Sequence, residues 1–438
     1  MVSKNKILIF ILVLSFFLRL TSLNYMEFKG DEAHNSFKAL DFVENGKLPL
    51  TALRGTTGLN YPPIFIYLIS IPYAFSTNPI VATGFIALAN VLATFICFVL
   101  VNKLFNKKAA IISALLFTVN PWQVIFSRKL WDVNFSALFI FLLLLFLYNT
   151  FQENKKSHLA YAMLTLGILL QLHISLSYIL LPALIMIIPY HKKIDKKYLA
   201  IGTILFLITL IPYSIFEMKN NFIDFKTLSE KSGENYFHPT AFIIPFKMIS
   251  TLGFNGDMGN SFQSFITPFK SFYLIDFIVM FLLLVSIIYL FKTKYKAYSW
   301  WFLIGVLYLA ISKVPSIDTN YFTSLLPISF IIMGVALASI IRKSSKNTQM
   351  AIYIFLFIII IHQLAFSFHF IDFISNNECI DGNYGMPYQH RLDYIQNTIN
   401  NENIASPSER IEEINTQSCD CKKCDLKAAE YIINEVIS

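Results

Sequence analysis

Apolar runs of about 18 to 20 residues recur along this chain and limit its fold more than any other feature of the sequence. About 20 helical residues cross the bilayer core, because each residue of a helix rises about 1.5 Å. Only 14% of the 438 residues are charged, whereas soluble domains are about a quarter charged. The sequence therefore predicts an all-α polytopic membrane protein. Its net charge of +8 indicates membrane topology rather than a nucleic-acid surface.

Lysine and arginine gather in alternate connections between the apolar runs, as the positive-inside rule expects of cytoplasmic loops. Lys4 and Lys6 precede the first run, so we expect the N-terminus in the cytoplasm. The next loop is then expected on the extracytoplasmic side. No small-residue cleavage site follows this run, so we interpret it as a retained span. We expect eleven spans and an extracytoplasmic C-terminus. The expected spans are residues 7–23, 80–101, 109–126, 135–151, 159–172, 176–190, 198–216, 272–291, 300–311, 321–341 and 350–368.

Two outer loops and a polar tail surround the expected spans. Residues 1–370 form the predicted membrane domain, with a first outer loop at 24–79 and a long outer loop at 217–271. Residues 64–75 within the first loop are apolar but short and rich in proline nearby, so we expect an interfacial helix. Residues 371–438 form a small extracytoplasmic region. It holds four of the five cysteines, Cys379, Cys419, Cys421 and Cys424, for which disulfides in any of three pairings, or a metal, remain open.

The first polar loop carries the adjacent carboxylates Asp31 and Glu32 directly before a stretch with helical periodicity. One interpretation is structural, because negative charge at a helix N-terminus stabilises the helix dipole. The other is catalytic, because apolar surroundings raise the pKa of a carboxyl and suit it to take a proton from a hydroxyl or amine. Both interpretations remain open from these residues alone.

A second cluster of polar residues lies in the short loop at 127–134, which is expected outside although it carries Arg128 and Lys129. These cations either snorkel to the interface or bind phosphate, arginine through paired N–H groups and lysine as a point charge. Asp132 would orient them or act with Asp31 on a shared ligand or metal.

Polar residues at the outer ends of other spans are further candidates. Gln171 and His173 are expected to face the bundle interior or a wet cavity, or simply to bond to a neighbouring helix. Tyr321, which follows Asp318 and Asn320, is a candidate for the same cavity mouth or for an interfacial aromatic belt.

Three ordered segments carry a family resemblance: GDEA at 30–33, YPPIFIYLISIPYAF at 61–75, and VNKLFNKKAAIISALLFTVNPWQVIFSRKLWDVN at 101–134. In this order they resemble the GT-C class of membrane glycosyltransferases, with protein O-mannosyltransferases and the lipid A aminoarabinose transferase as nearest relatives. The resemblance extends over roughly the first 190 residues. It implies a GT-C-like bundle that takes a sugar from a polyprenyl-phosphate donor on the outer face.

The resemblance also implies site residues. Asp31 matches the catalytic acid of the first loop and Asp132 the acid of the second. Pro62 and Pro63 would line the entrance of the carrier, with Asn134 and His173 lining the cavity. Some relatives carry lysine immediately before the two prolines, but Tyr61 stands here. The expected donor-phosphate residues are therefore Arg128, Lys129, Arg54, Tyr61 and Tyr321.

The expected reaction is an inverting transfer in which Asp31 deprotonates the acceptor and polyprenyl phosphate leaves. A divalent metal would help but is not required, and the sugar and acceptor are open. Two alternatives remain. A lipid-linked polysaccharide polymerase or ligase usually uses outer-loop arginines, whereas residues 217–271 contain five lysines and no arginine. A transporter would show internal repeats and charges at mid-membrane depth.

Overall fold

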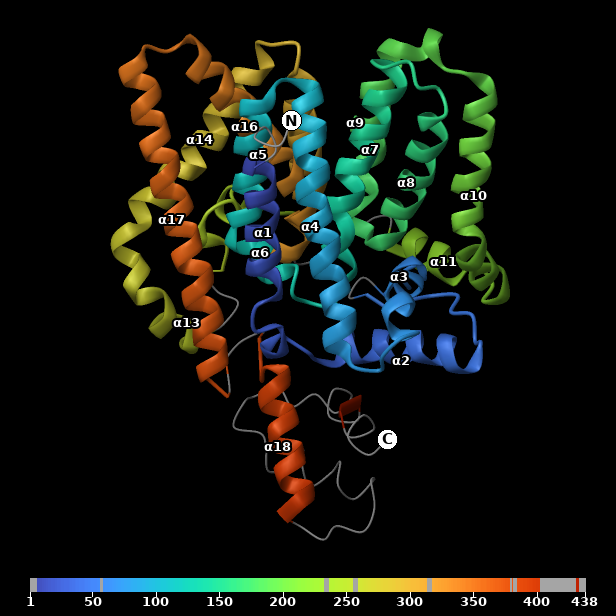
Figure 1. The fold of residues 1–438 in the computed structure, drawn as a ribbon. Helices are drawn as coiled ribbons and strands as arrows, with labels where there is room; N and C mark the ends of the chain where they lie inside the picture. Colours follow the sequence, from blue (N-terminus) through green and yellow to red (C-terminus); the bar gives the residue numbers. More distant parts are fainter. Residues whose placement is uncertain are drawn as a thin grey trace.

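A bundle of long helices forms the body of the protein, and shorter helices lie across one end of it (Figure 1). The computed structural model describes residues 6–55, 58–231, 236–254, 259–312, 317–378, 380, 384–401 and 431–432. The bundle helices are α1 (Lys6–Leu20), α4 (Pro79–Leu104), α5 (Lys107–Val119), α7 (Ser136–Phe151), α8 (His158–Leu172), α9 (Leu180–Ile187), α10 (Lys196–Lys219), α14 (Tyr273–Phe291), α15 (Lys296–Ala310), α16 (Leu326–Lys343) and α17 (Lys346–Asn376). The shorter elements are α2 (Gly30–Asn45), α3 (Ile64–Tyr73), α6 (Pro121–Phe126), α11 (Ile223–Glu230), α12 (Ile244–Met248), α13 (Gly259–Ile266), α18 (Tyr388–Asn401) and the antiparallel strands β1 (Tyr236–Phe237) and β2 (Ile311–Ser312).

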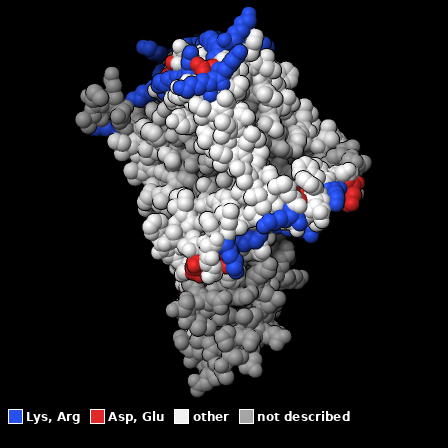
Figure 2. Space-filling view, turned by 90° about the vertical axis from the view of Figure 1, so that its right-hand side faces the viewer, with Lys and Arg blue, Asp and Glu red and all other residues white. Residues whose placement is uncertain are grey.

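Every apolar run that was expected to cross the membrane coincides with a bundle helix, so the predicted all-α polytopic class is confirmed. Seven helices within the described ranges, with their flanking turns, are long and apolar enough to span a bilayer. The other four matching helices, α1, α5, α8 and α15, are 13 to 15 residues long. The lysine-rich connections between helices lie at the end of the bundle opposite to α2, where Figure 2 shows a dense gathering of positive side chains.

The central helix of the bundle is α16, whose apolar window is 94% buried. It lies so close to α5 that a Cβ atom on Gly334 would approach Ser113 Oγ to 1.9 Å. Small residues at such a contact let two membrane helices pack backbone to backbone. At the other extreme, α10 stands at the edge of the bundle (Figure 1), with only 6% of its apolar window buried.

Two arginines stabilise the helix ends beside the break between α5 and α6. Pro121 has no N–H group, so the carbonyl of Phe117 loses its helical partner. Arg19 of α1, fully buried, donates to the carbonyls of Phe117 at 3.3 Å and Thr118 at 3.2 Å. In return, Arg128 donates to the carbonyls of Thr21 and Ser22, just beyond α1, at 2.6 and 2.7 Å. The Arg19 contacts join α1 to the end of α5, and the Arg128 contacts join the chain just after α1 to the loop that follows α6.

Replacing Arg19 with methionine should destabilise the protein by about 2 kcal/mol, because two buried carbonyls lose their donor. Thermal unfolding of the purified protein in detergent measures the effect. Arg19→Lys keeps a cationic donor group at this position. Its stability should therefore lie between those of the wild type and Arg19→Met. Unchanged unfolding of Arg19→Met would show that the α5 carbonyls do not depend on this side chain.

The end layer is built on α2, which lies across the ends of the bundle helices, with α3 packed beside it (Figure 1). Lys38 of α2 donates to the carbonyl of Ala52 at 2.7 Å and so holds the loop after α2. Asp224 of α11 accepts from the Asn60 backbone N–H at 3.1 Å and from its side chain at 3.0 Å. The short apolar helix expected within residues 64–75 is found as α3, at the same end of the bundle as α2.

The C-terminal segment packs against the first loop. Tyr388 N–H donates to the carbonyl of Met26 at 2.9 Å, and Tyr384 donates to the carbonyl of Tyr25 at 2.9 Å. Helix α17 continues to Asn376, past the expected domain boundary at 370, and α18 follows in the C-terminal segment. Cys379, Cys419, Cys421 and Cys424 lie outside the described residues, whereas Cys97 is a buried free thiol.

Candidate functional site

Asp31 and Glu32 form the first turn of α2, and their side chains diverge. Asp31 is exposed and lines two cavities, whereas Glu32 is fully buried. One oxygen of Glu32 accepts the backbone N–H of Lys29 at 2.9 Å, which caps the helix. The structural interpretation therefore describes Glu32, and the position of Asp31 leaves it accessible to a ligand.

Lys129 lies between buried carboxylates beneath this turn. Its Nζ atom is 2.8 Å from Glu27 and 3.6 Å from Glu32, and it lies 3.2 Å from the centre of the Trp131 ring. Lys29 also pairs with Glu27. Burial raises the pKa of Glu32; for Glu27, burial acts in the same direction, but Lys129 and Lys29 outweigh it and lower the pKa. Two lysines thus converge on the cavity from one buried network.

Arg128 contributes to the site differently from the phosphate role expected of it. Both terminal nitrogens of its guanidinium donate to the carbonyls that follow α1, and burial lowers its pKa to about 10. These contacts hold the loop in place. Arg128 is therefore better suited to positioning Lys129 than to binding a ligand anion directly.

The first of the two cavities, the carboxylate cavity, has a volume of about 200 Å³. Asp31, Asp132 and Asp318 line it together with exposed Arg54. Asp132 accepts the backbone N–H of Val133 at 2.6 Å, which orients its carboxylate. The other lining residues are Asn35, Ala52, Leu53, Gly55, Tyr61, Phe65, Trp131, His173, Asn320 and Tyr321. The carboxylate cavity therefore brings together with Asp31 five other expected site residues: Asp132, Arg54, Tyr61, His173 and Tyr321.

Aromatic rings form one wall of the carboxylate cavity. The ring of His173 lies 5.1 Å from that of Tyr61 and 5.2 Å from that of Tyr321. Burial lowers the pKa of His173 to about 4, so its imidazole is neutral at neutral pH. Burial also raises the pKa of the Tyr61 phenol, which stays protonated. This wall therefore carries no charge.

The second cavity, the aromatic cavity, has a volume of about 470 Å³ and a mixed lining. Its apolar wall consists of Trp122, Ile125, Phe126, Phe254, Phe370 and Ile374. Its polar lining consists of Glu27, Lys29, Arg128, Lys129, Thr319 and Tyr384. Asp31, Trp131, Asp318 and Asn320 line both cavities. The aromatic cavity thus combines an apolar wall with three cations and three carboxylates, and Asp31 lines both cavities.

Several expected site residues have other roles. Asn134 lines neither cavity; it donates to the carbonyl of Lys129 at 2.9 Å and so braces the loop. Pro62 and Pro63 are also absent from both linings, although Tyr61 and Phe65 on either side of them are present. Gln171 donates to the carbonyl of Gly167 within its own helix at 3.0 Å.

Other lining residues had no place among the expected site residues. Lys29 and Glu27 were missed, although a lysine directly before an acidic helix start is a visible signal. Trp122 and Phe254 come together only through tertiary packing. Among the residues that the structure describes, no group of three or more His, Cys, Asp or Glu side chains is arranged to hold a metal ion.

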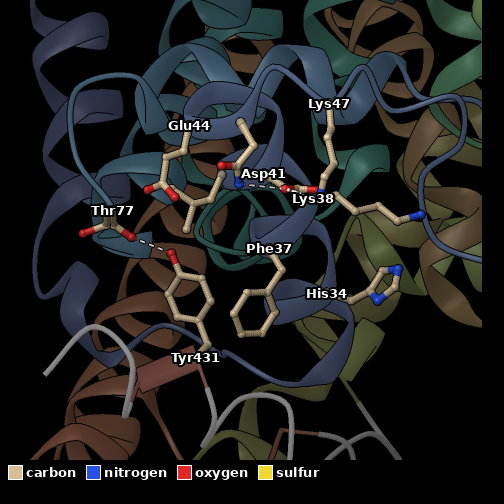
Figure 3. Close-up of a pocket in the computed structure, with 10 residues that line it drawn as sticks. His34, Phe37, Lys38, Asp41, Glu44, Lys47, Thr77 and Tyr431 are labelled. Atoms are coloured by element: carbon tan, nitrogen blue, oxygen red, sulfur yellow. Dashed lines mark hydrogen bonds and ion pairs between the residues drawn. The ribbon is translucent and has the colours of Figure 1, made fainter. Parts of the chain in front are cut away.

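A further cavity of about 620 Å³ lies beside the middle and the end of α2 (Figure 3). His34, Lys38, Asp41 and Asn45 line it at helical spacing, and the Tyr431 ring packs on Phe37 at 5.1 Å. Asp31 is not part of this lining. This cavity and the carboxylate cavity are therefore lined by different residues of α2, and Asp41 offers an acidic control residue on the same helix.

Comparison with known proteins identifies the fold. The family model described as dolichyl-phosphate-mannose-protein mannosyltransferase matches residues 60–216. No curated protein sequence matches the chain. The crystal structure of ArnT from Cupriavidus metallidurans bound to undecaprenyl phosphate matches with a TM-score of 0.61 at 12% identity, covering 98% of this chain and 85% of that one. Its apo form gives the same TM-score and identity, with 97% and 84% covered.

A more distant match is the Archaeoglobus fulgidus oligosaccharyltransferase in complex with zinc and sulfate. Its TM-score is 0.51 at 15% identity, and the match covers 93% of this chain but 56% of that longer chain. At these identities the likeness shows the fold. The expected GT-C-like fold is thereby confirmed, and the match to the mannosyltransferase family model lies in the region that contains the second-loop residues.

Proposed function

We propose that this multi-pass membrane protein, which has the GT-C fold, transfers a sugar from a polyprenyl-phosphate donor to an acceptor. One observation carries the proposal: Asp31 lines both a larger cavity, which has an apolar wall and contains Lys29 and Lys129, and a smaller cavity with three carboxylates. A lipid phosphate and a polar acceptor would meet at this residue. ArnT, whose fold is similar, has been crystallised with undecaprenyl phosphate, which supports a donor of this class.

In the proposed reaction the acceptor hydroxyl or amine approaches through the carboxylate cavity. Asp31 takes its proton as the acceptor atom attacks the anomeric carbon. The bond between that carbon and the phosphate oxygen breaks with inversion, and the electron pair leaves on polyprenyl phosphate. Lys129 and Lys29 stabilise the charge of the leaving group. Asp132 and Asp318 would bind hydroxyl groups of the sugar or the acceptor.

The assay that tests this function uses membranes containing the protein and polyprenyl phosphates that carry labelled mannose, glucose or a pentose. Transfer of label to a new glycosidic product is the expected result, and the donor that reacts identifies the sugar. A polymerase or ligase would instead move preassembled saccharides. Movement of label across the membrane with no new glycosidic bond would favour the transporter alternative and refute the proposal.

The site is proposed to face the outside of the plasma membrane, with the N-terminus in the cytoplasm. Lys47 lies at the α2 end of the bundle and Lys294 in the connection between α14 and α15, and both are exposed. In a background without Cys379, Cys419, Cys421 and Cys424, Lys47→Cys should react with an impermeant thiol reagent in intact cells. Lys294→Cys should react only after permeabilisation, and the opposite pattern would invert the proposed orientation.

A further inference from the structure

A groove lined by lysines lies at the end of the bundle opposite to Asp31, and the proposed reaction makes no use of it. The groove has a volume of about 640 Å³ and lies between the α7–α8 and α9–α10 connections. Its charged lining residues are Lys156, Lys192, Lys193, Lys196, Lys197 and Asp195. Five positive charges and one negative charge give the lining a formal charge of +4.

We propose that this groove binds the headgroup of an anionic phospholipid, whose acyl chains lie along α9 and α10. Basic pockets between membrane helices bind the phosphates of such headgroups by direct charge attraction. Helix α10 begins at Lys196, and its N-cap residue Asp195 accepts the backbone N–H of Lys197 at 3.0 Å. The donors that the groove offers to a phosphate are therefore lysine side chains.

The lysines of the groove have more positive charge than their protein partners neutralise. Lys156 lies 3.2 Å from Asp195, and Lys193 lies 3.4 Å from the carbonyl of Phe151. Lys192 and Lys196 are exposed and have no acidic partner in the part of the chain that the structure describes. Because like charges repel one another, a bound phosphate would relieve the repulsion among these lysines.

The surface beneath the groove indicates a lipid rather than a free anion. Ile204, Leu207 and Ile208 of α10 are 57%, 53% and 52% exposed. Leu184 of α9 is 54% exposed, and Ile188, directly after α9, is 63% exposed. Figure 2 views the α10 side and shows the gathered positive side chains directly above a broad band without charged side chains. A ligand with a phosphate head and long apolar chains matches both parts of this surface.

The connection between α14 and α15 supplies a matched control at the same end of the bundle. Lys292, Lys294 and Lys296 are all exposed there, and Lys346 lies at the start of α17. Replacing these four lysines with glutamine removes the same charge as replacing Lys192, Lys193, Lys196 and Lys197. A difference between the two fourfold variants therefore reports the groove and not the total charge.

The experiment measures binding of tetraoleoyl cardiolipin to the purified full chain in a neutral detergent, by native mass spectrometry and by the shift in unfolding temperature. No sugar donor is added, so the result does not depend on the proposed transfer reaction. The groove variant should bind cardiolipin at least about tenfold more weakly than the wild type, whereas the control variant should change by about twofold or less. Unfolding without lipid confirms that each variant is folded, and the paired variants K192Q/K193Q and K196Q/K197Q replace the fourfold one if it is not.

Three outcomes would overturn the proposal. Equal losses in the groove and control variants would show that cardiolipin binds through general surface charge. Equal stabilisation by zwitterionic dioleoylphosphatidylcholine would show that the net negative charge of the headgroup is not recognised. Full competition by inorganic phosphate at matched phosphate concentration would identify a site for a free anion rather than a lipid.

Discussion

Replacing Asp31 with asparagine is expected to lower the rate of sugar transfer by about 10² to 10⁴, the scale of general base catalysis. Asparagine keeps the size and much of the hydrogen bonding of aspartate but does not accept a proton at neutral pH. Donor binding should change little, because Lys129 and Lys29 would hold the phosphate. Single-turnover kinetics and equilibrium binding of the donor separate the two effects.

Two carboxylates on the same helix serve as controls. Asp41→Asn alters a residue of α2 that lines neither of the cavities beside Asp31, and it should leave the transfer rate near that of the wild type. Glu32→Gln removes a buried carboxylate that caps the helix, so its main effect should be on stability. If Asp31→Asn transfers normally while Glu32→Gln is inactive, the base has been assigned to the wrong neighbour.

Replacing Lys129 with methionine should have the second large effect, on both stability and donor binding. Its side chain is 7% exposed, and removing it leaves Glu32 in a fully buried position without its nearest cation. Breaking such a buried pair from one side costs about 3 to 5 kcal/mol. The loss of a charged contact to the donor phosphate should also raise the KM for the donor by about 10- to 100-fold.

A double variant separates these two roles of Lys129. In Lys129→Met with Glu32→Gln, the buried carboxylate is neutral, so much of the lost stability should return. The KM for the donor should remain high, because the phosphate still lacks its lysine. Recovery of both properties in the double variant would mean that Lys129 supports the fold and does not contact the donor.

The helical framework was predictable because membrane spans are long apolar runs that are visible in the sequence. Lysine-rich connections separate many of these runs, and every expected span coincides with a bundle helix. Breaks inside spans were harder to predict: the run expected at 109–126 is split at Pro121 into α5 and α6. That break persists because a buried arginine on α1, distant in sequence, takes up the freed carbonyls.

The candidate site was predictable where one short loop carries the residue, and unpredictable where tertiary contacts assign its role. Asp31 and Asp132 meet in one cavity, as their positions in the first two polar loops suggest. Arg128 and Lys129 are adjacent in sequence, yet one binds backbone carbonyls and the other lies among carboxylates. Sequence cannot distinguish these environments, because the carbonyls of Thr21 and Ser22 and the carboxylate of Glu27 come from the chain between α1 and α2, about a hundred residues earlier.

The contact between the C-terminal segment and the first loop has a consequence for the order in which the protein is made. Tyr25 and Tyr384, which form a hydrogen bond, are separated by 359 residues. The ribosome therefore synthesises every bundle helix before it reaches Tyr384, whose hydrogen bond supports the first loop. Under the proposed function, a chain still being translated holds its first loop without this support. The protein would then become active for transfer only at the end of synthesis, after all the helices have inserted into the membrane. Incomplete chains would consume no lipid-linked sugar.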